Sequence, residues 1–368
     1  MKRSFPFFLC LAFLSLATGA QQTVSPDDTA RFLAGLPLDG TALERFSSDP
    51  AWAQHSRSFD RAWKNFEQGQ LAKIRAWEQA NLSIALSSKS PVFYLFSGPD
   101  ALYAQTFFPN AKSYVLAGLE PVGTPPDVTQ LPPGSMGPAL AQLRNSLDTA
   151  FSFSFFKTKN MKEDLSRVEL GGTLPILYVF LVRSGIRIQS VELFAIDKTG
   201  APASPGKGTI PGVKITFSRG GEGKQPLFGG GGKQTLYYFS TNLSDEGVEA
   251  NPGFIRFCEA QGRGNSLLKA ASYLMHNSYF GKVRGFLLRN SDLVVQDDSG
   301  IPVRFFAPAK LEVNCFGNYL GPIDLFKGRY QSDLAAQFQT QQVPALPFSF
   351  GYRWHSKESC LIVARAKS

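Results

Sequence analysis

The chain has 368 residues, of which 43% are hydrophobic and 18% are charged, and its formal net charge is +9. This composition excludes a globally disordered, collagen-like or coiled-coil protein. The 32 phenylalanines, within an aromatic share of 13%, supply the side chains for a sizeable buried core. We therefore expect one large folded domain or two small ones.

The N-terminus has the pattern of a secretory signal peptide. The basic start MKR is followed by an apolar run over Phe5–Ala17 and by the small residues TGA. This pattern predicts a signal peptide over residues 1–20 and a periplasmic or secreted protein, with a retained anchor helix as the alternative. Cys10 follows Phe8 and Leu9, which does not fit a lipoprotein cysteine. No later run is apolar and long enough to cross a membrane, so no transmembrane segment is expected after cleavage.

Residues 21–88 are predicted to form a helical N-terminal arm. Residues 21–58 are polar with turn signals, and bulky apolar residues then recur at helical spacing over residues 61–80. This spacing predicts an amphipathic helix whose apolar face packs on the rest of the protein, with a groove in a partner as the alternative.

Residues 89–368 are predicted to form an α/β domain with a mixed, largely central sheet flanked by helices. Its clearest part is a strand over Val92–Phe96, a helix over Ala101–Phe108 and a strand over Ser113–Leu119. A strand, a helix and a strand in fewer than 30 residues indicate a compact crossover between parallel strands.

Further elements follow in chain order. A Pro/Gly-rich loop over 121–138 precedes a helix from Ala139 to about Phe156, and the apolar run Leu174–Val182 is either a helix or a buried strand. Strands are predicted over residues 187–196, 213–217, 234–240, 293–296, 305–306 and 311–315. Helices are predicted over residues 265–276, 280–289 and 332–339, and a closing hairpin over 348–354 and 360–364.

The sequence offers little for metal, cofactor or nucleic-acid binding. The Gly-rich segment 219–233 fits neither phosphate-binding motif and is predicted to be a hairpin loop. The basic residues Lys157, Lys159 and Lys162 are too few for a nucleic-acid stripe. We expect no metal, no cofactor and no nucleic-acid partner. An unknown small molecule or an envelope component remains as the partner, and the oligomeric state is left open.

Three cysteines follow the predicted signal peptide, at Cys258, Cys315 and Cys360. Their separation along the chain gives no metal-ligand spacing. One disulfide with one cysteine left over, in any of the three pairings, and three buried thiols are both compatible with the sequence.

The best candidate site lies at the ends of two predicted strands. Ser97 and Asp100 follow the first strand, and Glu120 follows the second. If these strands are parallel, all three side chains lie at the same sheet edge, where α/β proteins bind ligands. They could serve as nucleophile, base or metal ligand. However, Ser97 and Asp100 are also ordinary residues at the start of a helix, and capping is their commoner role.

His276 and the pair Asp297–Asp298 are secondary candidates. His276 is predicted to end the helix over 265–276, where the helix dipole favours a cation, and general acid–base use is the alternative. The two aspartates precede Ser299-Gly300. Paired carboxylates can hold a hard cation, but a solvated turn is the commoner structure for such a sequence.

Five distinctive strings extend across most of the chain after residue 20: FYLFSGPDALYAQTFFPNA, GLEPVG, SYLMH, QDDSGIPVRFF and FGYRW. Together they resemble a family of uncharacterised exported bacterial proteins. The resemblance implies an envelope or secreted location, and it brings no activity, substrate or catalytic residue.

Two functions follow as hypotheses. The first is a non-catalytic protein, binding or structural, that acts through a cleft at the sheet edge. The alternative is a periplasmic hydrolase that uses Ser97 or Asp100 with Glu120, assisted by His276. Both require the loops after Phe96 and Leu119 to open into one shared pocket.

Overall fold

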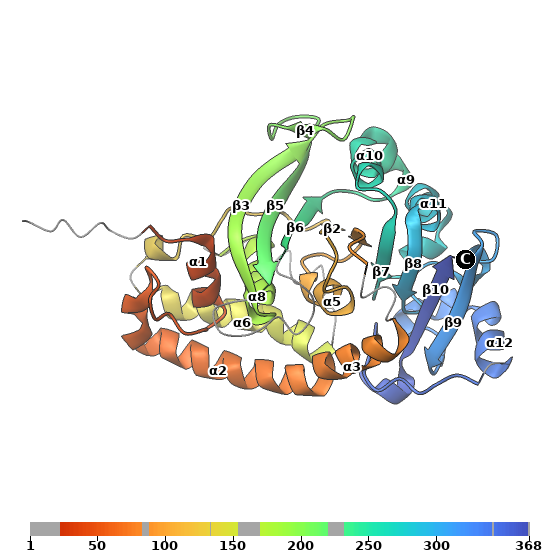
Figure 1. Ribbon diagram of the computed structural model, residues 1–368, viewed down its shortest axis with the longest axis horizontal. Helices are drawn as coiled ribbons and strands as arrows, with labels where there is room; N and C mark the ends of the chain where they lie inside the picture. The colour runs from red at the N-terminus through yellow and green to blue at the C-terminus, as the bar shows by residue number, and fades with distance from the viewer. Residues whose placement is uncertain are drawn as a thin grey trace, which may run out of the picture.

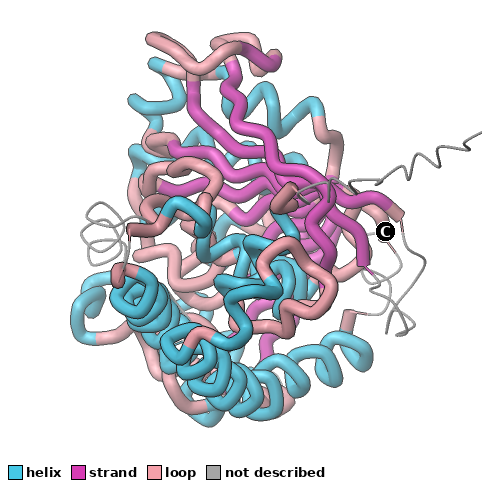
Figure 2. Tube along the Cα trace, turned by 90° about the vertical axis from the view of Figure 1, so that its left-hand side faces the viewer, coloured by secondary structure: helices cyan, strands magenta, loops and turns pink. Residues whose placement is uncertain are grey.

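The computed structural model describes residues 23–82, 88–132, 134–153, 170–219, 232–340 and 342–366. A mixed ten-stranded sheet lies at the centre, with strand order β4-β3-β5-β6-β2-β1-β7-β8-β10-β9 and helices on both sides (Figures 1 and 2). The predicted α/β class is therefore confirmed. The predicted signal peptide over 1–20, the lysines 157, 159 and 162, and most of the Gly-rich loop lie outside the described residues.

The middle of the sheet is parallel and both flanks are antiparallel. The parallel strands are β6 (Lys233–Ser240), β2 (Ser113–Gly118), β1 (Val92–Tyr94), β7 (Gly264–Leu268) and β8 (Ser291–Gln296). One flank consists of β5 (Ile210–Arg219), β3 (Ile186–Ile196) and β4 (Pro202–Ala203), and the other of β10 (Cys360–Ala366) and β9 (Leu311–Gly317). The predicted crossover is confirmed, because β1 and β2 are parallel and α5 (Ala101–Phe107) connects them.

Each face of the sheet has its own core cluster. Alternate side chains of β1 point to opposite faces, so that Val92 and Tyr94 join one cluster and Phe93 joins the other. Besides α5, the first cluster includes residues of α1 (Pro26–Leu33), α2 (Pro50–Phe66), α3 (Ala72–Asn81), α6 (Met136–Phe153) and α8 (Leu174–Arg183). The second includes residues of α9 (Asp245–Ala250), α10 (Gly253–Ala260), α11 (Gly281–Asn290) and α12 (Ser332–Thr340).

The N-terminal helices pack on the first face of the sheet. The apolar face predicted over residues 61–80 is buried there, in α2, a wider turn at Glu67–Leu71, and α3. Residues 21–58, which are polar with turn signals in the sequence, contain α1 and the start of α2. Both helices begin at a capping residue, Ser25 or Asp49, that is followed by proline.

Three further expectations are corrected. The segment 265–276 is not one helix, because β7 occupies its first part. Leu267 and Leu268 point to opposite, buried faces, so this strand lacks the alternation that distinguishes a strand from a helix. Residues 303–305 form a short 3-10 helix rather than a strand. Residues 348–354 form no strand, and β10 pairs with β8 and β9 instead of closing a hairpin with them.

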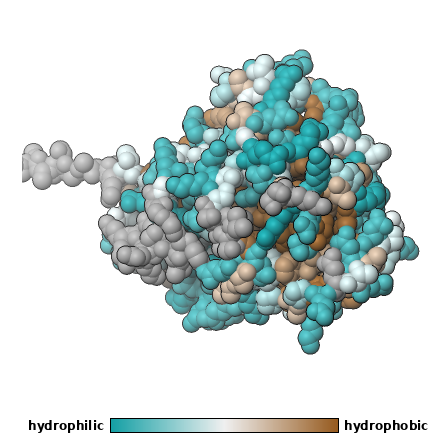
Figure 3. Space-filling view, turned by 45° about the vertical axis from the view of Figure 1, so that its right-hand side comes forward, coloured by the Kyte–Doolittle hydropathy of each residue, from teal (hydrophilic) through white to brown (hydrophobic). Residues whose placement is uncertain are grey.

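The remaining C-terminal elements follow the sequence more closely. Helices α11 and α12 and strands β8 and β9 lie where they were expected, and the ambiguous run Leu174–Val182 is helical, in α8. Cys258, Cys315 and Cys360 are all buried free thiols. Within the described ranges, no helix is long and apolar enough to cross a membrane. The face in Figure 3 is mostly hydrophilic, with apolar side chains gathered in one area.

Candidate functional site

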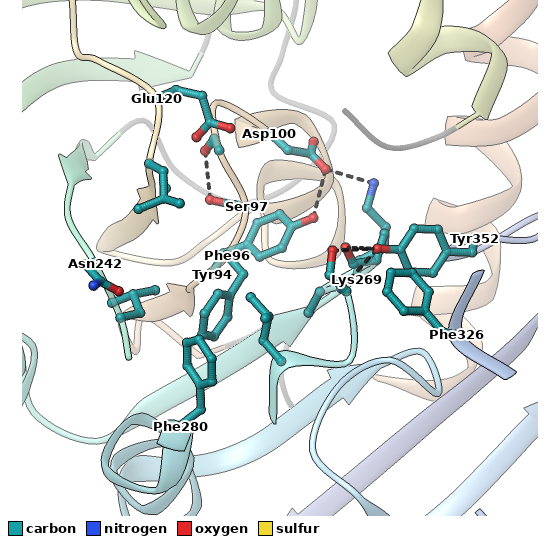
Figure 4. A pocket seen from close by; sticks show the side chains of 18 of the residues that line it. Tyr94, Phe96, Ser97, Asp100, Glu120, Asn242, Lys269, Phe280, Phe326 and Tyr352 are labelled. Atoms are coloured by element: carbon teal, nitrogen blue, oxygen red, sulfur yellow. Dashed lines mark hydrogen bonds and ion pairs between the residues drawn. The ribbon is translucent and has the colours of Figure 1, made fainter. Parts of the chain in front are cut away.

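The carboxyl ends of β1, β2, β6 and β7 surround a pocket of about 560 Å³. The loops after Phe96 and Leu119 both open into it, and Ser97, Asp100 and Glu120 all line it (Figure 4). Thus parallel strands do bring the three predicted residues to one cavity. Other polar lining residues come from the loops after β6 and β7 and from the C-terminal segment: Thr241, Asn242, Lys269, Ser272 and Tyr352.

The backbone around the pocket is unusual. Phe96, Ala270, Ser272 and Tyr273 have φ angles of +65°, +49°, +51° and +54°, a left-handed region that residues other than glycine rarely adopt. Three of these four residues line the pocket, and Tyr273 follows directly on Ser272. Such conformations cost free energy and cluster at ligand sites, where surrounding contacts hold them in place.

The turn after β1 is fixed to β2 by backbone hydrogen bonds. The N–H groups of Ser97 and Gly98 donate to the carbonyl oxygen of Ala117, at 3.1 and 3.3 Å. The Ser97 hydroxyl donates to the carbonyl oxygen of Gly98 at 2.8 Å. Its hydrogen is therefore directed at the backbone and not at a catalytic base.

Asp100 forms a buried ion pair as well as a helix cap. Its Oδ1 accepts the N–H of Tyr103 at 3.3 Å, which confirms the capping role. Its Oδ2 accepts the Tyr94 hydroxyl at 2.8 Å and lies 2.8 Å from Nζ of Lys269. The Lys269 side chain is only 1% exposed, and Nζ also lies 3.3 Å from the centroid of the Tyr103 ring. Burial lowers the pKa of Lys269, and the Asp100 carboxylate opposes this shift.

The strained loop after β7 is held by a buried aspartate. The N–H of Ala270 donates to Oδ2 of Asp297 at 3.0 Å, and the N–H of Ala271 donates to Oγ of Ser299 at 2.8 Å. Burial, reinforced by Asp298, raises the pKa of Asp297 to about 7. The expected turn is present, but the expectation that it is solvated is wrong, because the two aspartates are 1% and 9% exposed. These carboxylates support the pocket loop from behind.

Glu120 is the other buried carboxylate of the pocket, at 2% exposed. Within the described part of the chain, its sole hydrogen-bond donor is the Tyr238 hydroxyl, 3.4 Å from Oε2. That hydroxyl lies closer, at 2.8 Å, to the backbone oxygen of Glu120, and it has one hydrogen to give. A Cβ at position 118 would lie 2.2 Å from Oε2, so the carboxylate rests against the backbone of Gly118.

His276 is not brought into the site. It ends the 3-10 helix Leu274–His276, so the expected position at the end of a long helix is wrong, and it is not among the residues that line the pocket. Burial lowers its pKa to about 4, and its Nε2 has no hydrogen-bond partner within the described ranges. A triad-like arrangement of Ser97 with His276 is therefore not assembled.

The lining also contains apolar side chains, both aromatic and aliphatic. The rings of Phe96 and Phe280 meet edge to face with centroids 5.6 Å apart, and those of Phe326 and Tyr352 lie 5.5 Å apart. Leu325, also on the lining, is 80% exposed. Apolar side chains combined with buried charged and hydroxyl groups are typical of a small-molecule site.

The sequence missed Lys269, the cation of the site, because the segment that contains it was expected to be helical. Only two apolar residues, Leu267 and Leu268, directly precede this lysine, so the sequence gives little signal for it. No group of three or more His, Cys, Asp or Glu side chains that could hold a metal occurs in the described ranges. No family model, curated protein or solved structure matches this chain.

Proposed function

We propose that this chain binds a small organic molecule, without covalent chemistry, in the pocket at the carboxyl ends of β1, β2, β6 and β7. The observation that carries the proposal is a cavity of about 560 Å³ whose lining combines buried charged groups with aromatic rings. A ligand with an apolar body and a polar head fits that combination.

The backbone supports a binding site at this position. The left-handed residues at 96, 270 and 272 line the cavity and belong to two separate loops. The N–H of Ser97, next to Phe96, donates to Ala117, and those of Ala270 and Ser272 donate to Asp297 and Tyr352, which holds both loops in place. A pocket held in this way loses little conformational entropy when the ligand binds.

The hydrolase alternative has less support. A serine nucleophile needs a base within hydrogen-bond reach, and the Ser97 hydroxyl donates to the backbone of Gly98 instead. The nearest charged candidates each have a limitation, since Asp100 is paired with Lys269 and Glu120 forms no hydrogen bond with Ser97. Turnover of ester or amide substrates that is lost in Ser97→Ala would restore this alternative.

The proposal includes export. The basic and apolar N-terminus and the resemblance to exported bacterial proteins favour a periplasmic or secreted location, with a ligand taken from that compartment or from the envelope. Mass spectrometry of the protein from a bacterial host tests this point. A mature chain that starts near residue 21 supports export, and a chain that retains residues 1–20 in the cytosol contradicts it.

A neutral amphiphilic dye, N-phenyl-1-naphthylamine, tests the binding proposal. We expect saturable fluorescence enhancement with one site per chain, and weaker binding in Leu325→Asp because the change places a charge in the apolar part of the lining. Leu320→Asp is the matched control, because Leu320 is also exposed, at 61%, and does not line the pocket. The absence of saturable binding, or equal loss in both variants, would contradict the proposal.

A further inference from the structure

We infer that the ligand of this pocket carries a positively charged amine head, which pairs with the carboxylate of Glu120. The inference rests on the proposed binding function and narrows it to one chemical class. Its basis is that the buried carboxylate of Asp100 has a full set of partners, whereas that of Glu120 does not.

The difference is clearest between the two carboxylates. Asp100 has a lysine at 2.8 Å, a tyrosine hydroxyl at 2.8 Å and a backbone N–H at 3.3 Å. Within the described residues, Glu120 has no cation within ion-pair distance and one hydroxyl at 3.4 Å from its carboxylate. Both residues are almost fully buried. A buried carboxylate without a neighbouring cation is costly, so a ligand that supplied the cation would gain part of that free energy on binding.

The charges of the lining lead to the same result. Asp100, Glu120 and Lys269 are the ionisable Asp, Glu, Lys and Arg side chains that line the cavity. Lys269 and Asp100 neutralise each other, which leaves the charge of Glu120. A cationic ligand therefore completes the charge balance, whereas an anionic ligand would meet like charge in the pocket.

The surroundings of Glu120 suit an ammonium group. Figure 4 shows Glu120 and Ser97 on the same side of the pocket. An ammonium group has three donors, and the carboxylate and the Ser97 hydroxyl oxygen offer acceptors. Elsewhere in the lining, the pair of rings formed by Phe96 and Phe280 offers aromatic surface to the apolar body.

Three fragments with one aromatic ring and different heads test the inference. They are 2-phenylethylamine, neutral 2-phenylethanol and anionic 3-phenylpropionate, each measured by displacement of N-phenyl-1-naphthylamine and by ligand-observed NMR. For the unmodified chain we expect the amine to bind at least about ten-fold more tightly than the alcohol. The carboxylate fragment should bind most weakly, and the preference for the amine should decrease with added salt.

Glu120→Gln should remove the preference for the amine over the alcohol, as ligand-observed NMR measures it. Glu249→Gln is the matched control, because Glu249 is exposed, at 63% for its side chain, and lies outside the lining. Equal affinity for amine and alcohol in the unmodified chain, or an amine preference that survives Glu120→Gln, overturns the inference. Dye binding without amine preference overturns this inference alone, whereas absence of dye and fragment binding overturns the proposed function as well.

Discussion

Two walls of the same pocket differ in whether their buried charged side chains are paired with an opposite charge. On the α5–β7 wall, formed by Tyr94, Asp100 and Lys269, the two charges pair and the tyrosine donates to the carboxylate. On the β2–β6 wall, formed by Gly118, Glu120 and Asn242, the Glu120 carboxylate has one long hydrogen bond within the described residues. Burial of a charge therefore does not by itself mark a ligand site, and an incomplete set of partners beside a cavity is the more informative feature.

The N-terminal arm contains another buried titratable group, His55. His55 is fully buried in α2, and its Nε2 lies 2.8 Å from the oxygen of Leu33 while its Nδ1 lies 2.8 Å from Nη1 of Arg144. Since Arg144 can only donate, Nδ1 accepts and Nε2 donates, and the ring is neutral. Both ring nitrogens of His55 have hydrogen-bond partners, just as both charges of the α5–β7 wall are paired. His55 therefore has a structural role.

The largest expected effect on the free energy of unfolding comes from a change in the α5–β7 wall. Lys269→Met leaves the Asp100 carboxylate buried without its cation and should lower the free energy of unfolding by about 3–5 kcal/mol. The double variant Asp100→Asn, Lys269→Met should recover much of this loss, because it removes both charges. Urea unfolding measures both values. A single variant as stable as the unmodified chain would show that the pair is not needed to balance Asp100.

The next largest effect concerns how the stability of the protein depends on pH through His55 in the N-terminal arm. Burial lowers the pKa of His55 to about 4, below its usual value of 6.5. Between these values the unfolded chain binds a proton that the folded chain does not, so stability falls as the pH is lowered through this window. The slope from His55 alone approaches about 1.4 kcal/mol per pH unit.

His55→Gln should reduce this slope by the share of His55, since glutamine keeps a donor for Leu33 and does not titrate. His276 has a similarly lowered pKa, so part of the slope should remain. Urea unfolding between pH 4 and pH 7 gives the comparison. An unchanged slope in His55→Gln would mean that His55 is charged in the folded protein.

A smaller effect on stability is expected from a change in the β2–β6 wall, and it tests whether the position of the Glu120 carboxylate matters. In Gly118→Ala, the added Cβ would lie 2.2 Å from Oε2 of Glu120, so the carboxylate must move. We expect a stability loss of about 1–3 kcal/mol and a loss of amine preference, although the negative charge remains. Urea unfolding and fragment displacement measure the two effects. Retained amine preference would show that the position of the carboxylate is not decisive.

The smallest expected effect is that of Glu120→Gln on stability. Because Glu120 lacks a cation in the described residues, removing its charge should leave the free energy of unfolding unchanged or raise it by up to about 1 kcal/mol. The contrast with Lys269→Met is the measurement of interest. A loss of several kcal/mol would place Glu120 among the structural charges and would break the comparison.

Much of the fold could be predicted because local signals and tertiary structure agree. Pro99 and Asp100 mark the start of α5, and the apolar runs on either side of that helix are β1 and β2. The crossover rule then placed Ser97, Asp100 and Glu120 at one sheet edge. The failures occurred where burial on both faces removes periodicity, as in β7, or where carboxylates are buried, as at Asp297.

The chemical character of the site could not be predicted, because it depends on contacts between residues that are far apart in the sequence. Lys269 belongs to the pocket because β7 is a parallel strand next to β1, which is a long-range pairing. The incomplete set of partners of Glu120 depends on side-chain geometry, which one sequence does not reveal. His276 shows the reverse error, because a residue type suited to catalysis lies outside the lining.

The three cysteines have a consequence for how the fold is held together. Cys258, Cys315 and Cys360 are free and buried, and burial raises the pKa of each thiol. Thiolates are the species that react with oxidants, so these sulfurs are poorly reactive in the native state. Among the described residues, the cysteines thus contribute to the fold as small buried side chains and not as cross-links.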